Sequence, residues 1–77
     1  MTQRPFNIHP HIGYLNTEVS ITNTSDSDIV IYDNCKRLCS LRRNCIASGR
    51  FSAGLHVISL QEDYRSCEYS DSFTIED

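Results

Sequence analysis

The sequence lacks several features that mark common classes of protein. No run of apolar residues approaches the roughly 18 that a membrane-spanning helix requires, and the first residues, Met1–Phe6, contain no apolar stretch of the kind found in signal peptides. The three glycines are scattered, so no glycine-rich phosphate-binding loop is present. These absences predict no membrane partner. They favour a cytoplasmic protein, or an extracytoplasmic one if the chain is an excised fragment.

The length of 77 residues is enough for one domain, residues 1–77, and for no second one. A domain of this size buries only about 60–65% of the surface that its unfolded chain exposes. Its core is therefore thin, and a deep catalytic cleft would remove apolar packing that the fold needs. We expect a single domain that is a fragment of a longer protein, has no enzymatic activity and binds no cofactor.

Charge is unevenly distributed along the chain. Seven Lys and Arg residues stand against ten Asp and Glu residues, which gives a net charge of −3. The chain as a whole therefore lacks the basic character of nucleic-acid-binding proteins, and no nucleic-acid partner is expected. One basic cluster nevertheless exists, with the members Lys36, Arg37, Arg42, Arg43 and Arg50. Two interpretations stay open for it: a solvated basic loop, or a patch that binds an anionic partner.

Alternation of apolar and polar residues predicts β-strands. In Thr17–Asn23, Val19 and Ile21 alternate with polar residues, as in a half-buried strand. Residues 24–27 are polar and favour a turn, and Asp28–Asp33 is rich in β-branched residues. Strand, short turn and strand together predict a β-hairpin.

The rest of the chain completes an all-β prediction. Two prolines would interrupt a helix in residues 1–16, so this segment is expected to be extended, with an edge strand at Phe6–His9. Further strands are predicted at Ile46–Phe51, Leu55–Leu60, Tyr64–Tyr69 and Ser72–Glu76. About six to seven short strands without a long helical period predict a small antiparallel β-sandwich. Its core is expected to contain Val19, Ile21, Ile29, Ile31, Phe51, Ile58, Leu60, Phe73 and Ile75.

The segment 34–45 fits two structures. Cys35, Leu38 and Cys39 have the spacing of one face of a helix, and Asn34 is a suitable N-cap residue. This spacing favours an irregular crossover with a helical turn. A β-strand is the alternative.

Two stretches carry a resemblance to a known class of module. Phe51–Leu60 places an aromatic residue and a small-residue turn before an alternating strand, and Ser72–Glu76 is a closing strand of Phe-polar-aliphatic pattern. Together they resemble the C-terminal half of immunoglobulin-like or fibronectin-type-III-like modules of multidomain bacterial proteins, and Thr17–Asp33 is similar to their opening hairpin. The sequence departs from true immunoglobulin domains because it has no tryptophan. The resemblance implies an immunoglobulin-like β-sandwich that serves as a non-catalytic accessory or spacer module.

The four cysteines allow three chemical interpretations. Cys35 and Cys39, with three residues between them, have the spacing of one zinc knuckle, but Cys45 and Cys67 do not form a second. A metal site on these four cysteines is therefore only an alternative, and no zinc is expected. Four cysteines in a short chain also suit disulfide bridges, of which one from Cys67 to segment 35–45 would pin that segment to a strand. Buried free thiols are the third interpretation.

No pattern in the sequence assembles a catalytic set. His56 is expected to be a sheet residue with a hydrogen-bonded ring, and His9 and His11 to lie in an extended, solvated segment. The predicted function is thus a protein-interaction or accessory module of a larger bacterial protein. Its partner would be a neighbouring domain of the same chain or another protein, and the isolated domain would be monomeric. The alternative is a stand-alone metal- or redox-responsive domain built on the cysteines.

Overall fold

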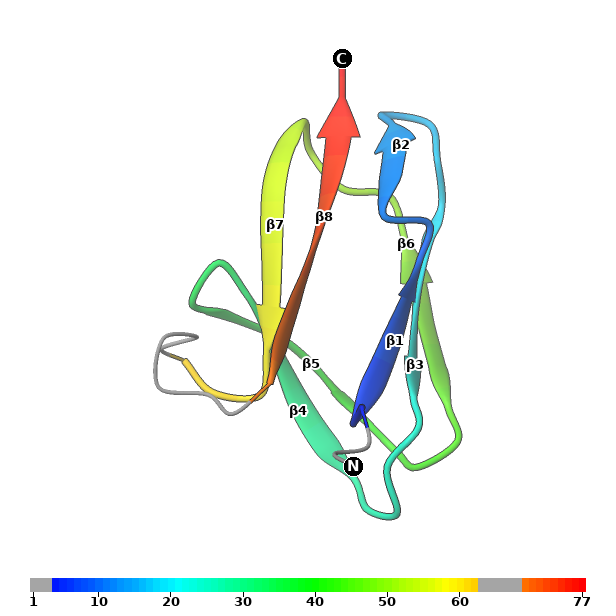
Figure 1. Cartoon of the computed structure of the whole chain (residues 1–77), viewed down its shortest axis with the longest axis vertical. Coiled ribbons are helices and arrows are strands. Elements are labelled where there is room, and N and C mark those ends of the chain that lie inside the picture. Colours follow the sequence, from blue (N-terminus) through cyan, green and yellow to red (C-terminus); the bar gives the residue numbers. More distant parts are fainter. Residues whose placement is uncertain (1–3, 63–68) are drawn as a thin grey trace.

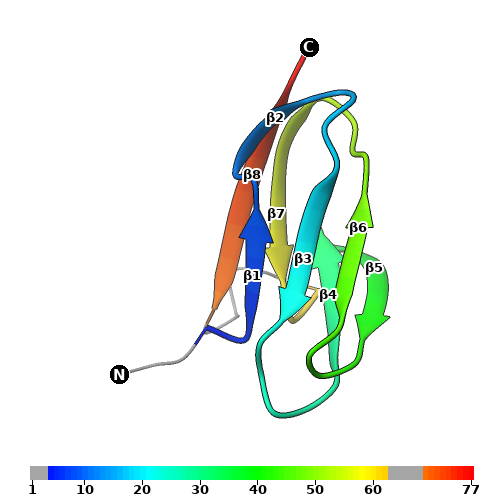
Figure 2. The same ribbon diagram turned by 90° about the vertical axis from the view of Figure 1, so that its right-hand side faces the viewer.

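The computed structural model describes residues 4–62 and 69–77, which form two facing β-sheets (Figures 1 and 2). One sheet has three strands in the spatial order β1 (Phe6–His9), β3 (Val19–Asn23) and β6 (Ile46–Gly49). The other has five, in the order β2 (Ile12–Tyr14), β8 (Ser70–Glu76), β7 (Gly54–Ser59), β4 (Ile29–Asp33) and β5 (Lys36–Leu41). The all-β prediction is confirmed. None of the described residues forms a helix that could cross a membrane.

The strand count and one pairing differ from the prediction. The described residues contain eight strands rather than six or seven, and β2 pairs with β8 in parallel, whereas all other strand pairs are antiparallel. The added strands are β2 and β5, and the parallel pair comes from the N-terminal segment, where β1 joins the three-stranded sheet and β2 joins the other. Pro10 lies between them and has no N–H group to continue a strand ladder. The predicted edge strand Phe6–His9 is confirmed as β1.

The predicted hairpin of Thr17–Asn23 with Asp28–Asp33 is wrong. Both strands exist, as β3 and β4, but they belong to different sheets, and the loop between them crosses from one sheet to the other (Figure 1). The side chain of Asn23 holds this loop from inside, because it bonds both to Ser25 and to the carbonyl oxygen of Ser27. A loop that is tied to the interior in this way leads the chain across the core instead of reversing it within one sheet.

The favoured crossover with a helical turn in segment 34–45 is also wrong. The chain forms a hairpin of β4 and β5, in which Asp33 pairs with Lys36. The two loop residues, Asn34 and Cys35, have φ angles of 50° and 72°, as a type I′ turn requires. The Asn34 side chain donates to the Leu55 carbonyl at 3.0 Å and accepts from the Val57 N–H at 2.9 Å. Tertiary pairing thus overrides the helical spacing of the cysteines.

The conformation of Cys35 leads to a stability prediction. A non-glycine residue in the left-handed region costs roughly 1–2 kcal/mol, and Asn-Gly is the preferred sequence of a type I′ turn. Cys35→Gly is therefore expected to raise the free energy of unfolding by about 0.5–1 kcal/mol, measured by urea denaturation. Cys35→Ala is the matched control, because it also removes the thiol but keeps the Cβ atom. Equal stability of the two variants would contradict this explanation.

The core lies between the two sheets and is formed mostly by the residues that alternation indicated. Six predicted residues are buried: Val19, Ile21, Ile31, Ile58, Phe73 and Ile75. Phe6, Ile8 and Leu41 are also buried and were not predicted, because they lie in segments interpreted as a lead-in and a crossover. Ile29, Phe51 and Leu60 are only partly buried and pack at the border of the core. The predicted strand Tyr64–Tyr69 lies outside the described residues except for Tyr69.

Candidate functional site

A groove opens along one side of the sandwich, where the two sheets do not meet. Strand β5 is an edge strand of its sheet and β6 is an edge strand of the other, and residues of both line one groove. The groove between them has a volume of about 390 Å³. It is lined by Ile21, Asp33, Leu38, Cys39, Ala47, Ser48, Gly49, Arg50, Phe51, Ser52 and His56.

The floor of the groove is apolar and incompletely filled. Ala47 and Gly49 of β6 pair with the buried residues Ile21 and Val19 of β3, so all four positions face the same side of the sheet. A Cβ atom added at Gly49 would have no neighbour within 4 Å. On the opposite wall, the β4–β5 register shifts next to Leu38, whose side chain is 39% exposed. The small residues of β6 thus leave room above the floor.

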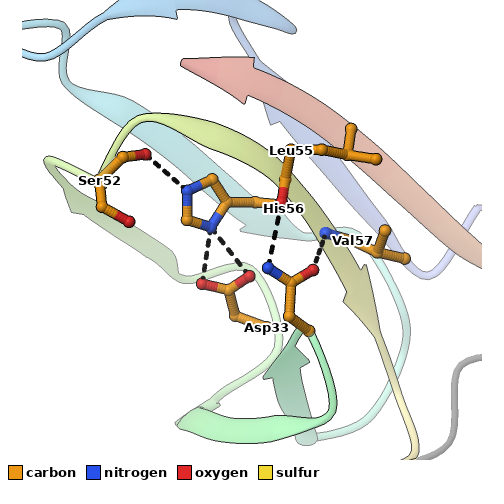
Figure 3. A network of polar contacts seen from close by, with 6 residues as sticks. Asp33, Ser52, Leu55, His56 and Val57 are labelled. Carbon is orange, nitrogen blue, oxygen red and sulfur yellow. Dashed lines mark hydrogen bonds and ion pairs between the residues drawn. The ribbon is translucent and has the colours of Figure 1, made fainter. Parts of the chain in front are cut away.

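One end of the groove is closed by a partly buried polar contact. The His56 ring lies with Nδ1 2.9 Å from Oδ2 of Asp33 and with Nε2 2.7 Å from the Ser52 carbonyl oxygen (Figure 3). Both nitrogens face acceptors, so only a doubly protonated ring donates to both. The ring also stacks on Phe73 with 5.0 Å between centroids. The prediction that His56 is a sheet residue with a hydrogen-bonded ring is confirmed.

This contact gives His56 an anchoring role. It ties β7 both to the end of β4, through Asp33, and to the segment that follows β6, through Ser52. Because both ring nitrogens are already engaged inside the protein, neither is presented to a molecule in the groove. The arrangement therefore shapes the groove.

The five predicted basic residues lie at the ends of the two strands that border the groove, and we call them the basic rim; of these, Arg50 lines the groove. Arg42 and Arg43 lie in the connection from β5 to β6 at one end, whereas Lys36, Arg37 and Arg50 lie at the other end. All five are exposed. The ion pairs found in residues 4–62 and 69–77 are His11–Asp71 and His56–Asp33, so no rim residue takes part in one there. Residues 34–52 contain no Asp or Glu at all.

The described cysteines are spread along the β5 hairpin and are not gathered at one point. Cys35 lies in the turn before β5, Cys39 lines the groove, and Cys45 is exposed in the connection to β6. No disulfide joins any two of these three. Within the described ranges, no group of three His, Cys, Asp or Glu side chains could hold a metal ion. The predicted bridge from Cys67 lies outside the described residues.

A second hollow lies beside β8 and is more polar. Its lining includes Arg4, His11, Tyr69 and Asp71, and Nε2 of His11 lies 2.9 Å from Oδ2 of Asp71. The His11 side chain is 52% exposed, so this contact contributes little to stability. Burial raises the pKa of the Tyr69 hydroxyl, and the nearby Asp71 raises it further. The hydroxyl therefore keeps its proton at neutral pH.

The fold and the groove together define a small two-sheet β domain with one open, basic-rimmed side. Comparison with protein-family models, curated proteins and solved structures finds no match for this chain. The basic residues of the groove were visible in the sequence as a charge cluster. The groove itself was not, because it depends on which strands end each sheet.

Proposed function

We propose that this chain is a non-catalytic protein-interaction module that binds its partner in the groove between β5 and β6. The observation that carries the proposal is the basic rim, whose five exposed cations lie at the ends of the two strands that border an apolar groove and outside the ion pairs found in the described residues. Cations that border an apolar centre are suited to a partner with complementary charge. The partner is another protein or a neighbouring domain of the same chain.

The sheet topology supports an immunoglobulin-like assignment as part of this proposal. In that arrangement, strands A, B, E and D form one sheet and strands C, F and G the other. In chain order, β1, β3 and β6 correspond to A, B and E, whereas β4, β7 and β8 correspond to C, F and G. Strand D would pair with β6 and has no counterpart among the described residues. Its place is the open side on which the groove lies.

A photo-cross-linking experiment tests the proposed function. The photoreactive amino acid p-benzoylphenylalanine is placed at position 38, in the groove wall, and in a second protein at position 7, which is exposed on β1. In the cells that produce the protein, we expect one discrete cross-linked protein or domain from position 38 and none from position 7. Mass spectrometry of the cross-linked peptide identifies the partner and separates contacts between chains from contacts within one chain.

Charge reversal supplies the control for this experiment. Combining Arg37→Glu with Arg50→Glu should abolish the cross-link from position 38, whereas Arg4→Glu, which makes the same kind of change outside the groove, should leave it intact. Equal cross-linking from positions 7 and 38, or no discrete product from either, would refute the groove as an interaction site.

A further inference from the structure

We infer that the groove receives an extended segment with an apolar centre and acidic ends, which adds as a new strand to the free edge of β6. This inference rests on the proposed function and specifies the chemistry of the partner. It follows from the backbone of β6, from the side chains that β6 turns inward, and from the placement of the basic rim.

The backbone of β6 is the first reason. Strand β6 pairs with β3 along one edge only, and no strand of residues 4–62 or 69–77 pairs with its other edge. Such an edge carries a row of N–H and C=O groups ready to bond an added strand. Extended peptides bind to exposed sheet edges in this way, with main-chain hydrogen bonds supplying affinity and alternate side chains supplying specificity.

The inward side chains are the second reason. Ala47 and Gly49 are the two inward positions of β6, and the space above Gly49 is open. In a strand paired with β6, every second side chain would also point inward. Those side chains would fill the space between Leu38 and Phe51, which are both only partly covered. Apolar residues at these alternate positions would complete the core at its open side.

The charges are the third reason, and they select the occupant. An extended segment along β6 runs from Arg42 and Arg43 at one end to Arg50 at the other. On β5, Lys36 pairs with the groove residue Asp33, whereas the Arg37 guanidinium donates to the Ser40 hydroxyl. Acidic residues at both ends of the segment would neutralise these cations. A second copy of this chain is disfavoured at the groove, because pairing of two such edges would bring two basic rims together.

Binding of synthetic peptides tests the inference. The probe is a labelled peptide of about nine residues, in which Val and Thr alternate in the centre and Asp and Glu occupy both ends. One control peptide carries Lys and Arg at the ends, and another replaces the central Thr residues by Pro, which removes their N–H groups. Fluorescence anisotropy measures affinity, and hydrogen–deuterium exchange measures protection of the β6 amides.

We expect the acidic peptide to bind at least tenfold more tightly than either control peptide and to slow exchange of the amides of Ile46–Gly49. Gly49→Val should weaken binding at least tenfold by filling the space, while its melting temperature is unchanged or higher. Ser72→Val adds the same side chain to an exposed position of β8 and should bind like the original protein. Arg50→Glu should weaken binding, and Arg4→Glu should not.

Several outcomes would overturn the inference. Equal binding of the Pro-containing peptide or of an oligothymidylate would show that charge alone is recognised. Protection of β5 amides instead of β6 amides would place the added strand on the other edge. Dimerisation in sedimentation that Gly49→Val abolishes would make a second copy the occupant. If cross-linking at position 38 succeeds while β6 amides stay unprotected, the strand-addition inference fails and the proposed function stands. If cross-linking fails, the proposed function itself fails.

Discussion

Replacement of Phe73 by alanine is expected to lower the free energy of unfolding by about 3–5 kcal/mol. The Phe73 side chain is 1% exposed. Its ring contacts Phe51 edge-on, with 4.9 Å between centroids, and stacks on His56. Removing the ring would leave a cavity between the sheets and free the ring of His56. Because a domain this small has only a few kcal/mol of stability, most molecules of the variant should be unfolded at 37 °C.

Far-UV circular dichroism during urea denaturation measures this effect, since the chain has no tryptophan for fluorescence. Tyr14→Ala is the control, because Tyr14 is also aromatic but is 58% exposed, and the change should stay within about 0.5 kcal/mol. Phe73→Leu should fall between the two. A melting temperature of Phe73→Ala equal to that of the original protein would show that the core does not depend on this ring.

The sequence was sufficient to predict strands wherever burial of one face imposes a period of two. Val19 and Ile21 in β3, and Phe73 and Ile75 in β8, alternate with more exposed residues and are all buried. Alternation does not specify the neighbours of a strand, however. The assignment of β3 and β4 to one hairpin failed because two strands show the same alternation of apolar residues whether they pair with each other or belong to different sheets.

The groove could not be predicted for a related reason. Its walls are β5 and β6. For the residues of β5, a helical turn was favoured over a strand. The signal that could have identified β5 was Asn34, since asparagine tolerates the left-handed conformation of a type I′ turn. Even if β5 is assigned as a strand, the open side exists only because β5 and β6 are edge strands of their sheets. That property depends on pairing between residues far apart in the sequence.

Asn23 makes four side-chain hydrogen bonds, a role in the core that its place in the sequence did not indicate. It is fully buried, and its Nδ2 donates to the carbonyl oxygens of Ser27 and Leu41, both at 2.9 Å. Its Oδ1 accepts from the N–H and from the hydroxyl of Ser25. The amide thus uses its full capacity of two donors and two acceptor lone pairs. Residues 23–25 match a glycosylation motif, but in the folded protein this amide nitrogen is already engaged.

Asn23→Leu is therefore expected to lower the free energy of unfolding by about 3–5 kcal/mol. Leucine has nearly the same size, but it leaves the Leu41 carbonyl oxygen and the Ser25 N–H without this partner, whereas the Ser27 carbonyl still accepts from the Ser25 hydroxyl. Each orphaned group costs roughly 1–3 kcal/mol. Urea denaturation measures the loss, with Asn7→Leu on the exposed side of β1 as a control that should change stability by less than about 0.5 kcal/mol.

Asn23→Asp separates loss of hydrogen bonds from loss of packing. The carboxylate keeps the shape and the acceptors of the amide, but at neutral pH it faces the carbonyl oxygens of Ser27 and Leu41 without a proton to donate. Protonation restores one O–H donor. The stability of Asn23→Asp relative to the original protein should therefore increase as the pH falls from 7 to about 4, because the folded state binds the proton more tightly than the unfolded state. Asn23→Leu has no group that titrates, so its deficit should stay constant over this range. A constant deficit for both variants would show that packing at this position, and not hydrogen bonding, holds the loop between the sheets.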